Sequence, residues 1–229
     1  MHLNVSTDVL ALGLRHVRVW QLSSDLPLLS GTGPTVEELA GPREAYAPVP
    51  PGYADLFAVL GYPDTVPAGA RLRELAATRE LRSHGLVVDV VSAATLFHGG
   101  GIGLHQLPDE DAEADFLVTR AKGSERMVPA FSKKSRPVPE GDLLYGAAHP
   151  DGRFHPYAWL GRRDCDAADR QLTEDSRRAL LVALGCPGEG PEHTEAIGSA
   201  VARLLAEHGS GIRISEVPLQ PQPAAAAAG

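Results

Sequence analysis

The sequence predicts a single α+β domain. Strand-like and helix-like segments follow one another without a regular strand–helix alternation, which favours this class over a parallel α/β sheet. A chain of 229 residues, of which 43% are apolar and 22% charged, is long enough to bury one substantial core. We expect one folded unit over residues 1–218 and a disordered Pro- and Ala-rich tail over residues 219–229, which has nothing to bury.

The first half of the chain predicts three helices. Thr35 and Glu38 have the spacing of a capping box, so a short helix is expected to begin there. Residues 53–85 predict a helix, a Pro-Asp turn and a second helix around residues 68–80. The buried stripe of that second helix would consist of Leu72, Leu75 and Ala76.

The middle of the chain predicts strands. Residues 86–97, LVVDVVSAATLF, are β-branched at first and Ala-rich later, which favours a buried strand that turns into a short helix. Residues 114–122, 142–149 and 155–161 predict three further strands, and the charged segment between the first two of them predicts a turn.

The last part of the chain predicts two helices and a strand. Thr173 is followed by acidic residues, so residues 172–185 predict a helix that Thr173 caps. Residues 192–209 predict a second helix, and residues 211–219 predict a final strand. One face of the second helix gathers Ile197, Val201, Leu204 and Leu205.

The composition argues against several functions. A formal net charge of −8 argues against a broad basic face, so we expect no DNA partner. No apolar run approaches the ~20 residues that span a bilayer, and the first residues lack the pattern of a signal peptide. Cys165 and Cys186, the only cysteines, are expected to be free thiols. These observations predict a cytoplasmic protein without a membrane contact.

The glycine cluster in residues 97–105, FHGGGIGLH, admits several chemistries. HGGG is the oxyanion loop of some lipases, but the Gly-x-Ser-x-Gly elbow that such enzymes need is absent from the sequence. The cluster also lacks the Lys-Ser/Thr of a phosphate loop, and acidic residues follow it. From the residues alone the glycines predict a turn that brings the backbone close to another element or to a ligand.

Histidines and cysteines give weaker signals. His98, His105, His149 and His155 have spacings that fit no compact ligand motif, even with the acidic residues beside Cys165, so we expect no metal and no cofactor. Arg162 and Arg163 could lower the pKa of Cys165 and make it a nucleophile, but a small buried thiol is the favoured interpretation.

Residues 85–107, GLVVDVVSAATLFHGGGIGLHQL, resemble a known family. They are similar to the B3/B4 domain of the phenylalanyl-tRNA synthetase beta chain, and more so to freestanding proteins built from that domain, which carry NxVVDVYNxVSL, a Gly- and Pro-rich turn and IGxHDL. The resemblance covers roughly residues 55–185, and it implies a three-layer sandwich of mixed β-sheets with packed helices. The matching positions are Val87, Val88, Asp89, Val90, Leu96, Gly99, Ile102, Gly103, His105 and Leu107.

The resemblance implies a function as well. In the synthetase this domain hydrolyses tyrosine wrongly attached to the phenylalanine tRNA, so we expect an aminoacyl-tRNA deacylase that acts in trans on the tRNA acceptor end. The implied catalytic residue is His105. The implied substrate-binding residues are Ser92, Thr95, Gly101, Gly103, Trp159, Arg163 and Thr173. For tRNA contact we expect Lys133, Lys134, Arg136 and Arg162, although a solvated loop is the ordinary interpretation of such a charge run.

The chain departs from the family pattern at three places. Ser92 stands where the family has an asparagine, Gly103 stands where the synthetase has its histidine, and Val182 lies near the position of a family acidic residue. Two other functions therefore stay open. One is transfer or carriage of the aminoacyl group in specialised metabolism, and the other is non-catalytic binding of an amino acid or RNA. The amino acid, the tRNA and the oligomeric state are not predicted.

Overall fold

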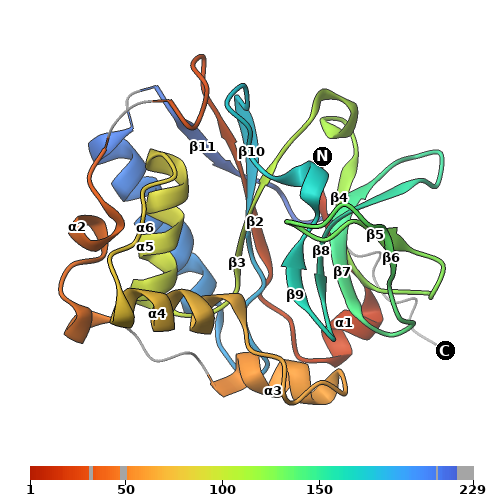
Figure 1. Ribbon diagram of the computed structural model, residues 1–229. Helices are drawn as coiled ribbons and strands as arrows, with labels where there is room; N and C mark the ends of the chain where they lie inside the picture. The colour runs from red at the N-terminus through yellow and green to blue at the C-terminus, as the bar shows by residue number, and fades with distance from the viewer. Residues whose placement is uncertain (31–32, 47–50, 210, 221–229) are drawn as a thin grey trace, which may run out of the picture.

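The computed structural model describes residues 1–30, 33–46, 51–209 and 211–220, which form three layers (Figure 1). A helical layer covers one face of a four-stranded sheet, and a five-stranded sheet packs on the other face. The α+β class and the sandwich of mixed sheets with packed helices are confirmed.

The central sheet has the strand order β11-β2-β10-β3, and its recorded pairings are antiparallel. The inner strand β10 is buried on both faces, since Leu181 packs against the helices while Leu180 and Val182 face the second sheet. A strand with two buried faces reads as a continuous apolar run. The bounds are β2 Arg18–Ser23, β3 Ile102–Gln106, β10 Arg178–Ala183 and β11 Arg213–Glu216.

The second sheet has the order β1-β4-β7-β8-β9, in which β1 pairs with β4 in parallel and the later pairings are antiparallel. A small hairpin of β5 (Arg126–Met127) and β6 (Arg136–Pro137) lies beside it, and Met127 and Val138 pack on Trp159. The bounds are β1 Leu3–Val5, β4 Asp115–Arg120, β7 Leu143–Ala148, β8 Phe154–Leu160 and β9 Asp164–Asp166.

The expected helices near residues 35, 53 and 68 are present. The Thr35 side chain and the Glu38 side chain make both hydrogen bonds of the capping box. Ala76 is fully buried and Leu72 partly so, but Leu75 is 37% exposed and does not belong to the buried stripe. The bounds are α1 Thr7–Ala11, α2 Val36–Ala40, α3 Pro51–Val59, α4 Ala68–Thr78, α5 Leu86–His98 and α6 Pro191–His208, with short 3₁₀ turns η1 Arg43–Ala45, η2 Asp109–Asp111 and η3 Ala168–Arg170.

Two segments differ from the secondary structure expected of them. Residues 86–97 are helical throughout, in α5, so the expected short helix at their end is present but the expected strand at their start is not. The reason is that α5 lies among α2, α4, α6 and the central sheet and is apolar on most sides. Residues 178–183 form the strand β10 rather than a helix. Thr173 caps no helix there: its backbone N–H donates to Ser176 Oγ at 2.8 Å, in a turn that leads into the strand.

The two ends of the described chain meet at the edge of the second sheet. Leu219 pairs with Leu3, and the Gln220 backbone N–H donates to the Leu3 carbonyl at 2.9 Å. The expected disordered tail falls mostly on residues 221–229, which lie outside the described residues. Within the described ranges, no helix has the length and apolar character needed to cross a membrane.

Candidate functional site

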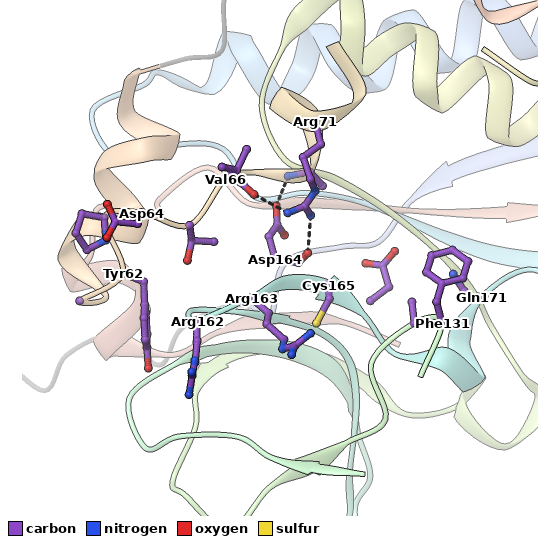
Figure 2. Close-up of a pocket in the computed structure, with 16 residues that line it drawn as sticks. Tyr62, Asp64, Val66, Arg71, Phe131, Arg162, Arg163, Asp164, Cys165 and Gln171 are labelled. Atoms are coloured by element: carbon purple, nitrogen blue, oxygen red, sulfur yellow. Dashed lines mark hydrogen bonds between the residues drawn. The ribbon is translucent and has the colours of Figure 1, made fainter. Parts of the chain in front are cut away.

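Two adjoining cavities open where α3, α4 and α5 meet the two sheets. The inner cavity has a volume of about 230 Å³ and the outer one about 1030 Å³, and Ala68, Asp164 and Asp166 line both of them. The inner volume is below the ~300–1,000 Å³ of pockets for drug-sized ligands, so it suits a group the size of an amino acid. Figure 2 shows the outer cavity, with Arg71 and Asp164 on one side and Arg162 and Arg163 on the other.

The glycine turn forms part of the inner cavity and makes room for two tyrosines. A Cβ atom added at Gly101 would overlap the Tyr53 hydroxyl, and one added at Gly103 would overlap the Tyr145 hydroxyl. Both tyrosines line the inner cavity. Burial raises the pKa of both phenols well above the ordinary value, so they stay neutral hydroxyls. The close approach expected of the glycines is therefore made to Tyr53 and Tyr145.

Two carboxylates stand where the cavities join. Asp164 and Asp166 are separated by one residue on β9, and a strand places such residues on the same face. Burial raises the pKa of each to about 6. Asp164 accepts a hydrogen bond from the Ala68 backbone N–H at 2.5 Å, at the first turn of α4. The two carboxylates are therefore mainly ionised at neutral pH although burial removes part of their hydration, and a bound cation would compensate for that loss.

The outer cavity is bordered by positive charge. Arg162 and Arg163 are exposed at its edge, and Arg71 lies opposite them. The Arg71 guanidinium donates to the Val66 carbonyl at 2.8 Å and to the Asp164 carbonyl at 2.9 Å, which fixes its position. The two cavities together thus form one site with two carboxylates at their junction and three arginines, together with the exposed Asp64, around the outer cavity.

An exposed aromatic ring completes the rim. Phe131 lines the outer cavity and is 98% exposed, with a backbone φ of 61°. A positive φ is uncommon for a residue other than glycine and strained for a bulky one, and such strain is concentrated at functional sites. Lys133 and Lys134 follow Phe131 closely in the chain and are exposed, but they are not among the residues that line the outer cavity.

His105 lies beneath the site rather than in it. The side chain is fully buried on β3, and its Nε2 lies 2.9 Å from the hydroxyl of Tyr145, which does line the inner cavity. Nδ1 has no hydrogen-bond partner among the described residues. Burial lowers the pKa of His105 to about 3, so the ring is neutral at any working pH. His105 therefore does not line the cavity, as a catalytic residue would, but contacts Tyr145 and positions the hydroxyl that does.

The other expected substrate-binding residues divide into two groups. Ser92, Thr95, Gly101 and Gly103 all line the inner cavity, and Arg163 lines the outer one together with Arg162. Two expected residues lie elsewhere. Trp159 packs under the β5–β6 hairpin, where its Nε1–H donates to Asp142 Oδ2 at 2.6 Å. Thr173 belongs to the turn before β10. Arg136 lies on β6 and is exposed.

Sequence reasoning missed the polar groups that give the site its character. The sequence indicates Asp164 and Asp166 only as possible metal ligands beside Cys165, and no local pattern points to Tyr53 or Tyr145. The alternation of the carboxylates in a short strand was the available signal. Burial is the main cause that raises the pKa of Cys165 to about 12, and the carboxylates of Asp166 and Asp164 add to it. The thiol is therefore a poor nucleophile.

Comparisons with known proteins add a limited finding. No family model matches the sequence, and no curated protein matches it. Among solved structures, the chain is similar to an N-terminal fragment of the phenylalanyl-tRNA synthetase beta-subunit from Pyrococcus horikoshii, with a TM-score of 0.49 and 10% sequence identity. That similarity covers 95% of this chain and 54% of the synthetase fragment, so the chain spans about half of the length of that fragment.

Proposed function

We propose that the protein binds the aminoacylated 3′ end of a tRNA in the joined cavities and hydrolyses the ester that links the amino acid to the tRNA. The observation that carries the proposal is the charge distribution of the site, acidic at Asp164 and Asp166 and basic at Arg71, Arg162 and Arg163. An aminoacyl-tRNA end has the complementary order of groups: an ammonium on the amino acid, the ester, and then the phosphates of the RNA.

The inner cavity suits the amino-acid end. Its volume of about 230 Å³ fits one small group, and the two carboxylates supply the negative charge that an α-ammonium needs. Asp164 accepts the Ala68 N–H through Oδ2, so its Oδ1 is assigned to the α-ammonium, and Asp166 is left to act on the ester. Ser92 and Thr95, with the hydroxyls of Tyr53 and Tyr145, provide further polar contacts in the inner cavity.

The outer rim suits the RNA end. Arg162 and Arg163 present guanidinium groups that bind phosphate through paired hydrogen bonds. The exposed ring of Phe131 offers a face on which a terminal base can stack, and stacking of a base on an aromatic side chain contributes about 1–3 kcal/mol. Lys133 and Lys134 would add phosphate contacts beside it. A contact confined to the acceptor end is compatible with a net charge of −8.

Hydrolysis in this site would use Asp166 as the general base. With a pKa of about 6 the carboxylate is ionised at neutral pH and more basic than an ordinary aspartate. A water molecule held by Asp166 would attack the ester carbonyl carbon and pass its proton to the carboxylate. The ribose oxygen would then leave with that proton, which gives a free amino acid and an uncharged tRNA. His105 acts through Tyr145, whose hydroxyl it positions at the cavity wall.

A non-hydrolytic role is the second candidate, and the burial of His105 favours it, because the expected histidine does not reach the ester. In that case the same cavity would hold an aminoacyl group for transfer to another acceptor, or would bind the amino acid alone.

The test is incubation of the protein with a panel of aminoacyl-tRNAs, in which both binding and loss of the ester are followed. We expect wild type to deacylate at least one member, Asp166→Asn to bind it but leave the ester intact, and the exposed control Asp151→Asn to behave as wild type. Binding without hydrolysis by wild type would replace the deacylase with the carrier role. Neither binding nor hydrolysis of any member would refute the whole proposal.

A further inference from the structure

Three side chains converge near the end of β7 and the start of β8, away from the cavities. Asp111 ends η2, His149 follows β7, and His155 lies on β8. Oδ1 of Asp111 is 2.9 Å from His149 Nε2 and 2.7 Å from His155 Nδ1, and the two ring nitrogens are 3.3 Å apart. We propose that this cluster, the Asp111–His149–His155 triad, binds a divalent transition-metal ion of the zinc type.

The chemistry and the spacing of the three atoms fit such an ion. Two imidazole nitrogens and one carboxylate oxygen are ligands that zinc accepts, and three protein ligands leave a fourth position for water. Ligand atoms about 2.0–2.1 Å from a tetrahedral zinc lie about 3.3 Å from one another. The observed separations of 2.7–3.3 Å are close to that value, so small rotations of the rings would admit the ion.

The carboxylate is held in the orientation that a ligand needs. The Tyr157 hydroxyl donates a hydrogen bond to Oδ2 of Asp111 at 2.8 Å, and the Arg170 guanidinium lies 3.4 Å from the same oxygen. These contacts occupy Oδ2 and leave Oδ1 facing the two rings. Outer partners of this kind fix the geometry of metal ligands. The Asp111 side chain is fully buried, so its orientation is set by these contacts rather than by solvent.

The site is open to an ion, and its charge is favourable. The His155 side chain is 26% exposed, whereas that of His149 is 8% exposed, so one side of the triad faces solvent. The Arg170 guanidinium also lies 3.5 Å from His155 Nδ1, and its positive charge is offset by Glu110 at 3.3 Å and Asp169 at 3.4 Å. With Asp111 the local balance is negative before an ion binds.

The position of the triad indicates a structural role. Along β8, His155 lies three residues from Ala158, which pairs with Asp166 of the cavities, a separation of about 10 Å at ~3.3 Å per residue. An ion there cannot reach an ester in the cavities. It would tie η2 to the hairpin of β7 and β8, so the inference stands independently of the proposed function.

Metal binding by the full-length chain tests the proposal directly. The protein is stripped with a chelator and titrated with zinc by equilibrium dialysis and calorimetry, with cobalt absorption as a second readout. We expect one ion per chain, a loss of affinity greater than about tenfold in His149→Ala and in His155→Ala, and no change in the exposed control His84→Ala. Zinc should also raise the melting temperature of wild type and not that of the two variants.

Two outcomes would overturn the proposal: less than one ion per chain in wild type, or unchanged affinity in both histidine variants. Asp111→Asn covers the case in which a histidine variant does not fold, because an amide oxygen still accepts from Tyr157 while the charged ligand is lost. Wild-type affinity in that variant would likewise refute the site.

Discussion

Replacement of Asp166 by asparagine should abolish hydrolysis and stabilise the fold at the same time. Burial raises the pKa of this carboxyl from 3.8 to about 6, so the folded state resists its ionisation. A shift of about two units corresponds to roughly 3 kcal/mol, and partial solvent access and coupling to Asp164 reduce the expected gain to about 1–3 kcal/mol. The site therefore stores a destabilising charge that its function requires.

The sign of the effect depends on pH. Because the folded pKa lies above the unfolded one, the protonated carboxyl supports the fold fully below pH 3.8, and this support is lost as pH rises through about 6. Urea unfolding at about pH 7.5 should show Asp166→Asn to be more stable than wild type, and the difference should disappear toward about pH 4. The exposed control Asp151→Asn should not gain stability at either pH. A less stable Asp166→Asn at neutral pH would refute the burial argument.

Three further outcomes follow from the site. Deacylation, corrected for the spontaneous reaction, should fall about tenfold per unit below pH 6 and level off above it, and a rate independent of pH across that range would exclude Asp166 as the base. Gly103→Ala should destabilise the fold by about 1–3 kcal/mol in urea unfolding, since its Cβ would overlap the Tyr145 hydroxyl, and an unchanged midpoint would contradict that contact. Phe131→Ala should weaken tRNA binding about tenfold, whereas Phe97→Ala, which removes another exposed ring, should not; equal effects would remove the stacking surface from the proposal.

The overall architecture follows from local patterns, but two core elements do not. The helices α2, α4 and α6 and the strands β4, β7 and β8 have clear local signals, such as the capping box of Thr35. In α5 and β10 most residues are apolar, because both elements are buried on most sides. An apolar run without alternation does not distinguish a helix from a strand, and tertiary packing then decides.

The part of the candidate site that comes from one continuous segment can be predicted from the sequence. Ser92, Thr95, Gly101 and Gly103 follow one another in sequence and line one wall. The opposite wall comes from β9, far away along the chain, and its carboxylates acquire their raised pKa only through burial.

Pairing of distant strands produces contacts that spacing does not reveal. His149 and His155 are brought together by the antiparallel pairing of β7 with β8, and Asp111 joins them from η2, 38 residues before His149. The spacing of the histidines therefore gave no metal motif.

The central claim is that the inner cavity recognises an ammonium group, and binding of matched ester mimics tests it most directly. One ligand is an adenosine that carries an amino acid through a stable amide, and the other has a hydroxyl in place of the α-amine. We expect the amine to bind at least about tenfold more tightly to wild type, and this preference to disappear in Asp164→Asn. Equal affinity of wild type for the two ligands would contradict the account.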